Sequence, residues 1–530
     1  MARTRVLTAA EAVRLIPDGA IVTVSSSSGL GCPDAVLAAI GARFDTEGHP
    51  RNLTTLHPIA AGDMWGIKGI DHLAKPGCLA KVLAGSYPSG PSSAEPPAIW
   101  QMISANALPA YNVPSGIMFD MHREAAAKRP GVLTKVGMDT YVDATREGCA
   151  MNARAAAAPI VSRVNFAGED WLFFPSIIPD VAIIRATTAD ERGNLSYEHE
   201  GGILGPLDQA LSVRNNGGLV IAQVKRLAAA GSLRPHDVVV PGVLVDVIVV
   251  APDQLQTTHT PYEPAISGEI FRPIASFETP KFDVGKAVAR RVAMELRDGD
   301  AVNIGFGISA NVPRILIEEG RHGTVTWVIE QGAIGGVPLL DFQFGCASNA
   351  EAIVQSPHQF TYFQGGGFDM SLLSFLQIDR FGSVNVSKLG ARPHVTAGAG
   401  GFVDITARAK RIVFSGYFTA GAGLEIADGA LKIAREGKIK KLVNEVEQVT
   451  FSGPRAVAQG QEIVYVTERC VLRLERDGVT VTEIAPGVDL QADVLARAEF
   501  PLRVAGGLKT MPAALFRPEP IGLELRRATN

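Results

Sequence analysis

Val325-Thr326-Trp327-Val328-Ile329-Glu330-Gln331-Gly332-Ala333-Ile334-Gly335-Gly336 is the stretch that decides how this chain is interpreted. Its first five residues are β-branched or aromatic, which is typical of a buried strand, and the glycines that follow predict a turn. In open α/β sheets, ligands bind beyond the carboxyl ends of the strands. Glu330 stands at such an end, where a carboxylate can act as a nucleophile, a base or a metal ligand, or can simply face solvent.

The composition is that of a globular protein with large cores. The chain has 530 residues, of which 46% are hydrophobic and 20% charged, and this length suits about three to four domains or two large ones. The net charge is −4 and no long basic run occurs. General nucleic-acid binding depends on clustered Lys and Arg, so we expect no nucleic-acid partner.

The cysteines and the apolar runs point to a cytoplasmic protein. The cysteines are scattered, odd in number and without Cys-x-x-Cys spacing, which favours reduced thiols over a disulfide framework or a zinc site. They are Cys32, Cys78, Cys149, Cys346 and Cys470. A charged residue precedes any long apolar run at the N-terminus, and no apolar stretch reaches about 18 residues, so we expect neither a secretory signal nor a membrane span.

A strand–loop–helix unit occurs twice along the chain. Each copy has an Asp-Gly turn, a short apolar strand, a loop of small residues and a proline that opens the next helix, and the turns and prolines align without a gap. The marks are Asp18-Gly19, the loop 25–31 and Pro33 in the first copy, and Asp298-Gly299, the loop 305–309 and Pro313 in the second. The first loop could hold a phosphate or a pantetheine chain, or be an ordinary connection; it matches the dinucleotide-binding glycine pattern poorly.

A second repeat supports the first. Asp190-Glu191-Arg192-Gly193-Asn194-Leu195 is similar to Asp379-Arg380-Phe381-Gly382-Ser383-Val384, and an apolar strand follows each. We therefore predict an α/β protein of two homologous open halves with mostly parallel sheets. The expected domains are 1–260 and 282–530, the second carrying Glu330, joined by a proline-rich linker at 257–281. Longer spacing in the first half predicts an insertion around 56–165.

Four loops of small residues follow Glu330 in close succession, at 335–338, 344–349, 364–369 and 398–402. We interpret them as loops whose backbone amides approach one site, because glycine lets a ligand come close to the backbone. Tight turns between short elements are the alternative interpretation.

Taken together, these features resemble class I CoA-transferases. Within that family the chain is most similar to the single-chain acetate or propionate CoA-transferases, and more distantly to succinyl-CoA:3-oxoacid CoA-transferase. The resemblance covers nearly the whole chain. It rests on the turn at Glu330, on 305–307, 365–369, 379–387 and 400–402, and in the first half on 110–114, 131–137, 214–218 and 223–226.

The resemblance implies that CoA passes between carboxylic acids by a ping-pong mechanism, with Glu330 as the nucleophile that becomes a glutamyl–CoA thioester. CoA is then a substrate, and no metal or tightly bound cofactor is expected. The implied partners are acyl-CoA and short-chain carboxylic acids, with no membrane, in a homodimer or homotetramer. The implied oxyanion and substrate residues are Gly400, Gly401, Ser115 and Asn112, and the implied CoA-binding residues are Gly305, Gly307, Gly365, Gly366, Gly367, Asp369, Asn385 and Lys388.

Two positions depart from the family pattern. Ser115 stands where related proteins often carry a Gln that faces the nucleophile, so either a water fills the gap or the acyl pocket is larger. Gln331 stands where relatives have Asn, Ala or Ser. The acids that are exchanged therefore stay open.

Two other classes of function remain. The first is an acyl-CoA hydrolase, or an acyl-carrier transferase subunit of a lyase or decarboxylase complex, on the same fold; exchange between free CoA esters and acids without a partner protein separates these. The second is a non-enzymatic ligand sensor on a related fold, against which Glu330 argues.

Overall fold

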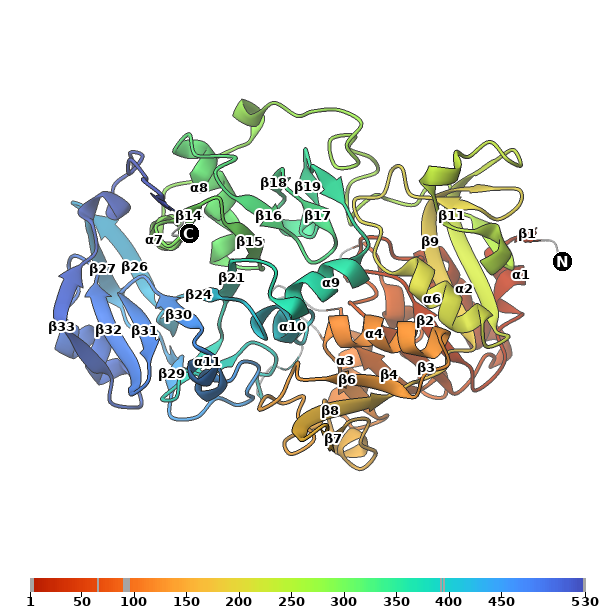
Figure 1. Cartoon of the computed structure of the whole chain (residues 1–530), viewed down its shortest axis with the longest axis horizontal. Helices are drawn as coiled ribbons and strands as arrows, with labels where there is room; N and C mark the ends of the chain where they lie inside the picture. The colour runs from red at the N-terminus through yellow and green to blue at the C-terminus, as the bar shows by residue number, and fades with distance from the viewer. Residues whose placement is uncertain (1–3, 64–65, 89–95, 391–392, 394–395, 528–530) are drawn as a thin grey trace.

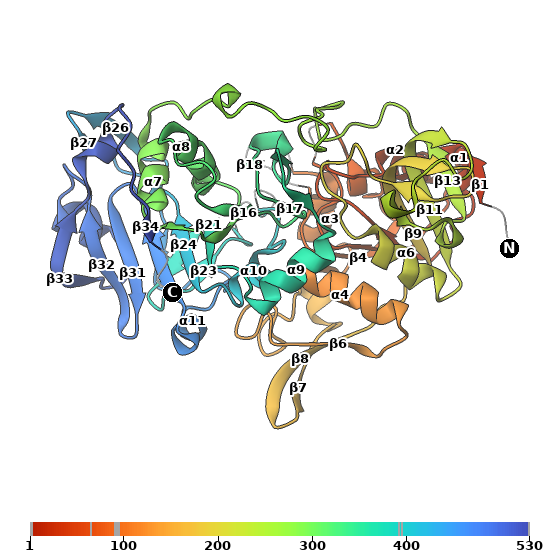
Figure 2. The ribbon, with the colours of Figure 1, turned by 45° about the horizontal axis from the view of Figure 1, so that its top comes forward.

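Two large sheets, one in each half of the chain, organise the computed structural model (Figure 1). The structure describes residues 4–63, 66–88, 96–390, 393 and 396–527. The N-terminal strands, drawn in red to yellow, lie at one end of the molecule and the C-terminal strands, in green to blue, at the other. The segment 251–283 carries the chain from the first sheet to the second and passes over the outside of the molecule (Figure 2).

The first sheet has the order β1-β13-β11-β9-β2-β3-β4-β5, and all neighbours along this path are parallel. β9 is buried at every residue, as the continuous apolar run of a covered parallel strand requires. The strands are β1 (Arg5–Leu7), β2 (Ile21–Val24), β3 (Leu53–His57), β4 (Leu79–Ala84), β5 (Ala110–Asn112), β9 (Val181–Asp190), β10 (Leu195–Ser196), β11 (Leu219–Ala228), β12 (Val238–Val240) and β13 (Val247–Val250).

The second sheet has the order β20-β17-β16-β15-β21-β24-β30-β31-β32-β33. Its central strands, from β16 to β30, are parallel, and antiparallel strands extend both sides. The strands are β15 (Ala301–Ile304), β16 (Thr326–Val328), β17 (Ala333–Ile334), β20 (Ala352–Ile353), β21 (Met370–Ser374), β24 (Arg411–Ser415), β30 (Glu462–Val466), β31 (Cys470–Glu475), β32 (Gly478–Ile484) and β33 (Arg503–Thr510).

The two sheets repeat one topology. The parallel path β13-β11-β9-β2-β3 corresponds to β30-β24-β21-β15-β16, and β2 and β15 each begin two residues after an Asp-Gly turn. The second repeat also holds, because Asp190 and Asp379 each accept hydrogen bonds from the backbone N–H groups two and four residues later. The predicted α/β architecture of two homologous halves is confirmed, and β16 before Glu330 is the counterpart of β3.

The range 56–165, where the sequence predicts an insertion, contains two kinds of structure. Residues in that range form β4 and β5, which continue the parallel sheet where the second half has the short antiparallel β17 and β20. The separate part is an antiparallel sheet in the order β6-β8-β7, made of β6 (Gly131–Thr134), β7 (Ser162–Phe166) and β8 (Glu169–Pro175). It projects from the body of the molecule (Figure 2).

Helices connect the strands. The predicted helix at 8–16 is shorter, and it begins with a capping box between Thr8 and Glu11. The helices are α1 (Ala9–Val13), α2 (Asp34–Glu47), α3 (Ala98–Ser104), α4 (Ser115–Ala126), α5 (Ala153–Ala156), α6 (Pro206–Arg214), α7 (Val284–Ala293), α8 (Val312–Glu318), α9 (Ser356–Gly365), α10 (Phe402–Thr406) and α11 (Gly453–Gln459). Within the described ranges, none of them combines the length and apolar character that crossing a membrane takes.

Short strands complete the second half. They are β14 (Arg297–Asp298), β18 (Val337–Pro338), β19 (Ala347–Ser348), β22 (Gln377–Asp379), β23 (Val384–Asn385), β25 (Thr419–Ala420), β26 (Gly423–Ala427), β27 (Ala430–Arg435), β28 (Ile439–Lys440), β29 (Leu442–Val443) and β34 (Arg526–Arg527).

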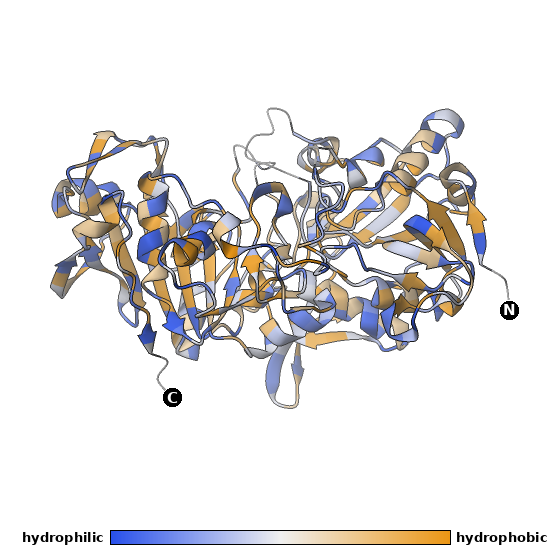
Figure 3. Ribbon diagram, turned by 90° about the horizontal axis from the view of Figure 1, so that it is seen from above, coloured by the Kyte–Doolittle hydropathy of each residue, from blue (hydrophilic) through white to orange (hydrophobic). Residues whose placement is uncertain are grey.

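Apolar residues are concentrated in the two central sheets (Figure 3). The core of the second half also takes in Ile59 and Phe119 from the first half. The Phe119 ring on α4 lies 5.7 Å from the Phe360 ring on α9, centroid to centroid. The junction between the halves is therefore a packed apolar interface, and α4, α9 and α10 meet there (Figure 1).

Candidate active site

Glu330 lies where the halves meet, in the turn that follows β16. Backbone bonds from Ile329 N to Ala333 O and from Gly332 N to Ile329 O close the turn, with Glu330 and Gln331 between them. Gly332 has φ +114°, and a Cβ there would collide with the Val354 carbonyl. Only glycine fits, so the sequence of this turn fixes the position of the carboxylate.

Gln331 and Gly401 lie next to the Glu330 carboxylate. Gln331 Nε2 donates to Oε1 at 3.1 Å, and a Cβ placed on Gly401 would lie 2.6 Å from Oε2. Burial raises the pKa of Glu330 to about 7, although the Gln331 bond acts in the opposite direction. The carboxylate is therefore more basic than an ordinary Glu and is still partly ionised at neutral pH.

The first half reaches this turn through the loop 25–31. Gln331 Nε2 also donates to Ser27 Oγ at 3.1 Å, and Ser27 belongs to the small-residue loop that follows β2. Gly345 makes room for the same side chain, because a Cβ there would lie 2.8 Å from Gln331 Cδ. Two of the glycine- and serine-rich loops noted in the sequence thus converge on the residue beside Glu330.

Asn112 uses its whole side chain to hold the loop before Gly401. Its Nδ2 donates to two carbonyl oxygens at the end of β4, Ala84 O at 3.1 Å and Gly85 O at 2.5 Å. Its Oδ1 accepts from Tyr141 Oη at 3.0 Å and from Ala399 N at 2.8 Å. With two bonds donated and two accepted, the amide is saturated, so Asn112 positions the loop and has no group left for a substrate.

Gly400 and Gly401 differ in what their backbone does. Gly400 N donates to Gly85 O at 2.7 Å, so in this conformation its N–H is not free to bind an oxyanion. Gly401 is the residue that lies against Glu330. Of the two glycines expected to bind an oxyanion, Gly400 therefore links the two halves and Gly401 is the neighbour of the nucleophile.

Ser115 begins α4 behind this loop. Its side chain is fully buried, and its hydroxyl has no hydrogen-bond partner among the described residues. A Cβ on Gly85 would lie 2.5 Å from Ser115 Oγ, and Ser115 N donates to Gly400 O at 3.0 Å. The residue is thus in contact with the loop, on the side away from solvent.

Gly305 and Gly307 lie at the same sheet edge as Glu330. They follow β15, the parallel neighbour of β16, and Gly307, with φ +114°, opens the 3-10 turn Ile308–Asn311. Between them the Phe306 side chain is 58% exposed, with its ring 5.5 Å from that of Phe344. The loop at Gly305–Gly307 is therefore adjacent to the turn that carries Glu330.

The residues 365–369 do not come to the site. Gly365 ends α9 and Gly366, with φ +73°, caps it, while Asp369 precedes β21 and accepts from Ala301 N at the amino edge of the sheet. α9 starts beside the active-site turn, because Ser356 Oγ donates to Gln331 O, and its ten residues, about 15 Å, lead to the opposite edge. In this structure the run caps α9 at the edge of the sheet away from Glu330, and its contact with CoA stays a prediction.

Asn385 and Lys388 form a turn of their own. Asn385 is buried, and its Oδ1 accepts from the N–H groups of Ser387 and Lys388. Its Nδ2 donates to Lys388 O and to Gln377 Oε1. Lys388 is exposed, and no described contact joins either residue to Glu330.

Several residues at the site were not predicted. Asp404 on α10 and Gln364 on α9 form a buried polar cluster with α4. Phe360 supports Gly401, where an added Cβ would lie 2.7 Å from its ring. Ser27 carried a sequence signal, its small-residue loop. Gln364 stood in the predicted loop 364–369, whereas Asp404 and Phe360 carried no signal, because each depends on a contact with a distant part of the chain.

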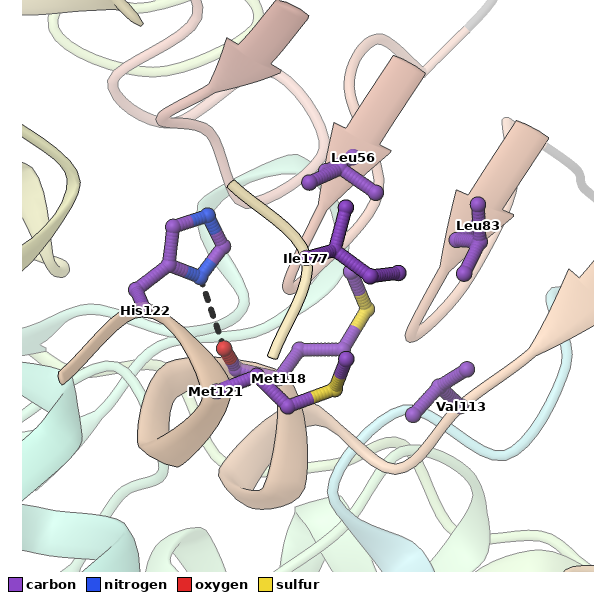
Figure 4. A pocket seen from close by; sticks show the side chains of 7 residues that line it. All are labelled: Leu56, Leu83, Val113, Met118, Met121, His122 and Ile177. Atoms are coloured by element: carbon purple, nitrogen blue, oxygen red, sulfur yellow. Dashed lines mark hydrogen bonds between the residues drawn. The ribbon is translucent and has the colours of Figure 1, made fainter. Parts of the chain in front are cut away.

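The small cavity beside the buried His122 offers no alternative active site (Figure 4). The cavity beside α4 holds only about 10 Å³ and is lined almost entirely by apolar side chains, among them Leu56, Leu83 and Met121. His122 has both ring nitrogens engaged, one with Met118 O and one with Thr23 Oγ1, each at 2.7 Å. Burial lowers the pKa of His122. With both ring nitrogens hydrogen-bonded, the role of His122 is structural.

Comparison with known proteins identifies the class of enzyme that this fold and carboxylate define. The Coenzyme A transferase family profile matches residues 6–251. Caffeate CoA-transferase of Acetobacterium woodii is 42% identical over 524 residues, which is 98% of this chain and 98% of that protein. The chain belongs to the coenzyme A transferase family and is an enzyme.

Solved structures agree. The apoenzyme of the acyl-CoA transferase YdiF from Escherichia coli O157:H7 superposes with a TM-score of 0.91 at 36% identity, covering 99% of both chains. A second structure of that protein, with the same TM-score, is a thioester complex with CoA. The resemblance stated from the sequence is confirmed at the level of family and fold.

Proposed function

We propose that the protein transfers CoA between an acyl-CoA and a free carboxylic acid by a ping-pong mechanism through a glutamyl–CoA thioester on Glu330. The observation that carries this proposal is the place of Glu330. It is the carboxylate at the carboxyl end of a central parallel strand, at the junction of the halves, with a pKa raised to about 7 by burial. The CoA thioester held by the similar YdiF structure supports it.

The chemistry needs only the carboxylate and the two substrates. A Glu330 oxygen attacks the thioester carbonyl, the C–S bond breaks, and CoA thiolate leaves a mixed anhydride. The thiolate then attacks Glu330 Cδ and expels the first acid as its carboxylate, which leaves the glutamyl–CoA thioester. A second acid attacks this thioester and reverses both steps, so no net proton transfer is required.

Raised basicity and fixed donors make a weak nucleophile effective. A carboxylate freed from part of its hydration attacks more readily, and each tetrahedral intermediate places negative charge on an oxygen that donors must stabilise. Gln331 Nε2 already donates to Glu330 Oε1 at 3.1 Å. We assign it and the Gly401 backbone to this role, with Gly400 contributing only if its bond to Gly85 opens.

We further propose that CoA lies along the carboxyl edge of the second sheet. The Gly305–Gly307 loop is adjacent to Glu330 on that edge. Further along it, beyond β21 and β24, a cavity of about 460 Å³ is lined by Tyr417, Thr419 and Lys441 among others. A pocket of this size accommodates a small-molecule group. Lys441, whose ammonium lies 5.1 Å from the centre of the Phe375 ring, would supply a cation for a phosphate, although burial lowers the pKa of Lys441 and Asp283 also lines the cavity.

Which carboxylic acids the enzyme exchanges has to be determined by assay. Similar proteins bear the names caffeate CoA-transferase and acetate CoA-transferase, so neither an aromatic nor a short aliphatic acid is favoured by similarity alone. The small Ser115 side chain supports acids larger than acetate. Cytoplasmic location and a homodimer or homotetramer are part of the same proposal.

The decisive experiment is a mass measurement of the intact protein after incubation with acetyl-CoA or butyryl-CoA and removal of the released acid. The mass should rise by that of CoA less water, and the modification should map to the peptide that contains Glu330. An adduct on Glu198, Glu200 or Glu351 would keep the reaction class and overturn the assignment of Glu330. A hydrolase would turn over and leave little adduct, and a sensor would release CoA unchanged.

A further inference from the structure

Asp404 bonds across the junction between the halves at the start of α4. Its Oδ2 accepts from Gly116 N at 2.9 Å, over 288 positions of sequence, and its Oδ1 accepts from Gln364 Nε2 at 3.0 Å. The side chain is completely buried. Gly116 has to be glycine here, because a Cβ would lie 2.5 Å from Asp404 Oδ1.

The N-terminus of α4 needs this partner. A helix leaves its first N–H groups unbonded, and a side chain at the N-cap normally accepts from one of them. The N-cap of α4 is Pro114, which offers no such acceptor. Asp404 takes the role from the other half, and its negative charge suits the positive end of a 12-residue helix.

The bond between Asp404 and Gly116 also controls the position of Gly401, the neighbour of the nucleophile. Asp404 lies in α10, whose N-cap is Gly401, the residue in contact with Glu330 Oε2. α10 has only five residues, so a shift of Asp404 moves Gly401 as well. A second bond, from Ser115 N to Gly400 O at 3.0 Å, ties the same two segments together.

The charges around Asp404 are mostly negative. Facing it are Glu330 after β16, Asp120 on α4 and the phenol of Tyr141, and Gln364 from α9 is neutral. Arg123 is engaged with Asp120 and Asp208, at 3.5 and 3.4 Å. Burial raises the pKa of Asp404 to about 7, and the Asp120 and Glu330 carboxylates add to the rise.

We propose that Asp404 is a positioning residue for the transfer reaction: it locks α10 to the N-terminus of α4, so that Gly401 stays against Glu330. The proposal rests on the proposed role of Glu330 as the nucleophile. It requires that the chemical step depends on Asp404 although Asp404 touches neither substrate.

Two variants separate the bond from the charge. Asp404→Asn keeps an oxygen for Gly116 N–H, and Gln364 can turn its amide to match. We expect kcat within a few-fold of the wild type and an unchanged pH profile of kcat/KM, because the bond to Gly116 is kept and the raised pKa of Glu330 comes from burial. Asp404→Ala removes the bond, and kcat should fall about 100-fold with little change in KM for acetyl-CoA.

The matched control loosens another contact between the halves. Arg455 on α11 pairs with Asp139 of the first half at 3.1 Å, so Asp139→Asn weakens the junction without touching the loop at Gly401. It should leave kcat and the pH profile unchanged, and thermal unfolding of all three variants reports any general loss of structure.

The rate of adduct formation on Glu330, followed by mass with acetyl-CoA or butyryl-CoA, completes the test. Slow adduct formation in Asp404→Ala, with normal formation in Asp139→Asn, supports the assignment. If the wild type forms no adduct, the proposed function itself fails. If the wild type forms it and Asp404→Ala forms it equally fast, or if Asp404→Asn loses as much activity as Asp404→Ala, the role given to Asp404 is wrong.

Discussion

The side-chain amide of Gln331 donates to Glu330 Oε1 and to Ser27 Oγ, each at 3.1 Å. One amide thus joins the reactive carboxylate of the second half to a loop of the first. Together with the bonds from Gly400 N to Gly85 O and from Ala399 N to Asn112 Oδ1, it makes the geometry of the site depend on how the two halves are docked.

Replacement of Glu330 should abolish transfer while the fold survives. Glu330→Gln keeps the shape and removes the nucleophile, so kcat should fall by roughly 10⁴-fold or more. Glu330→Asp keeps the charge but withdraws the oxygen by about one bond, which should cost about 100-fold. Rates of acyl exchange and a thermal melt measure both effects. Glu351→Gln, an exposed Glu close to the same turn, is the control, and near-normal activity in Glu330→Gln would sink the mechanism.

Glu330 should also make activity and stability depend on pH. The transfer needs the ionised form, so kcat/KM should rise with pH through about 7, the value to which burial raises the pKa. A carboxyl with a raised pKa binds its proton more tightly in the folded state. Its contribution to stability is therefore present below the ordinary value of 4.5 and is lost as pH rises to about 7.

Glu330→Gln stays neutral, so it should become more stable than the wild type as pH rises through that window, by about 1.4 kcal/mol for each unit of pKa shift. Denaturant unfolding at pH 5 and pH 8 measures the difference. A gap that is the same at both pH values would contradict the raised pKa.

Alanine at Gly401 and at Gly400 should have opposite consequences. At Gly401 the backbone tolerates a side chain, with φ −85°, but the new Cβ would lie 2.6 Å from Glu330 Oε2, so kcat should fall by roughly 10- to 100-fold. At Gly400 no atom lies within 4 Å of the new Cβ, but φ is +54°, so stability should fall by about 1–2 kcal/mol with activity largely kept. Equal losses of kcat in both variants would show that Gly401 has no special contact with the nucleophile.

Ser115 tests the size of the acyl pocket. If its small side chain leaves room for a larger acyl group, Ser115→Gln should shift the ratio of kcat/KM toward acetyl-CoA and away from butyryl-CoA. Ser115→Ala should leave stability unchanged or slightly higher, because it removes a buried hydroxyl that lacks a partner. The measurement is the ratio of kcat/KM for acetyl-CoA to kcat/KM for butyryl-CoA. A ratio that does not change in Ser115→Gln would show that position 115 does not line the acyl pocket.

Local features of the fold could be predicted from the sequence. The run before Glu330 is β-branched and aromatic and ends in glycine, and it forms β16 and its turn. The Asp-Gly turns at 18–19 and 298–299 directly precede the strands β2 and β15. Such features depend on residues a few positions apart, so their pattern is visible without knowledge of the fold.

The place of each glycine run in the fold could not be deduced from the run itself. The runs 305–307 and 365–369 look alike as sequence, but one follows a central strand beside Glu330 and the other caps α9 at the far edge of the sheet. The difference arises because α9 crosses the sheet from edge to edge. The glycines that end α9 do not reveal its length or direction, because the helix is only weakly amphipathic.

The sequence by itself determined the repeated α/β halves, the strand end that presents Glu330 and the membership of the family, since these depend on local propensity and on motifs carried intact along the chain. The tertiary structure decided which groups surround the carboxylate. Ser27 comes from the loop after β2, Gly401 and Asp404 come from the start of α10, and Asp404 bonds Gly116 across 288 positions. A buried polar contact is settled only when two distant segments are packed together and every donor has to find an acceptor, so the second half supplies the nucleophile and the docking of the two halves builds its site.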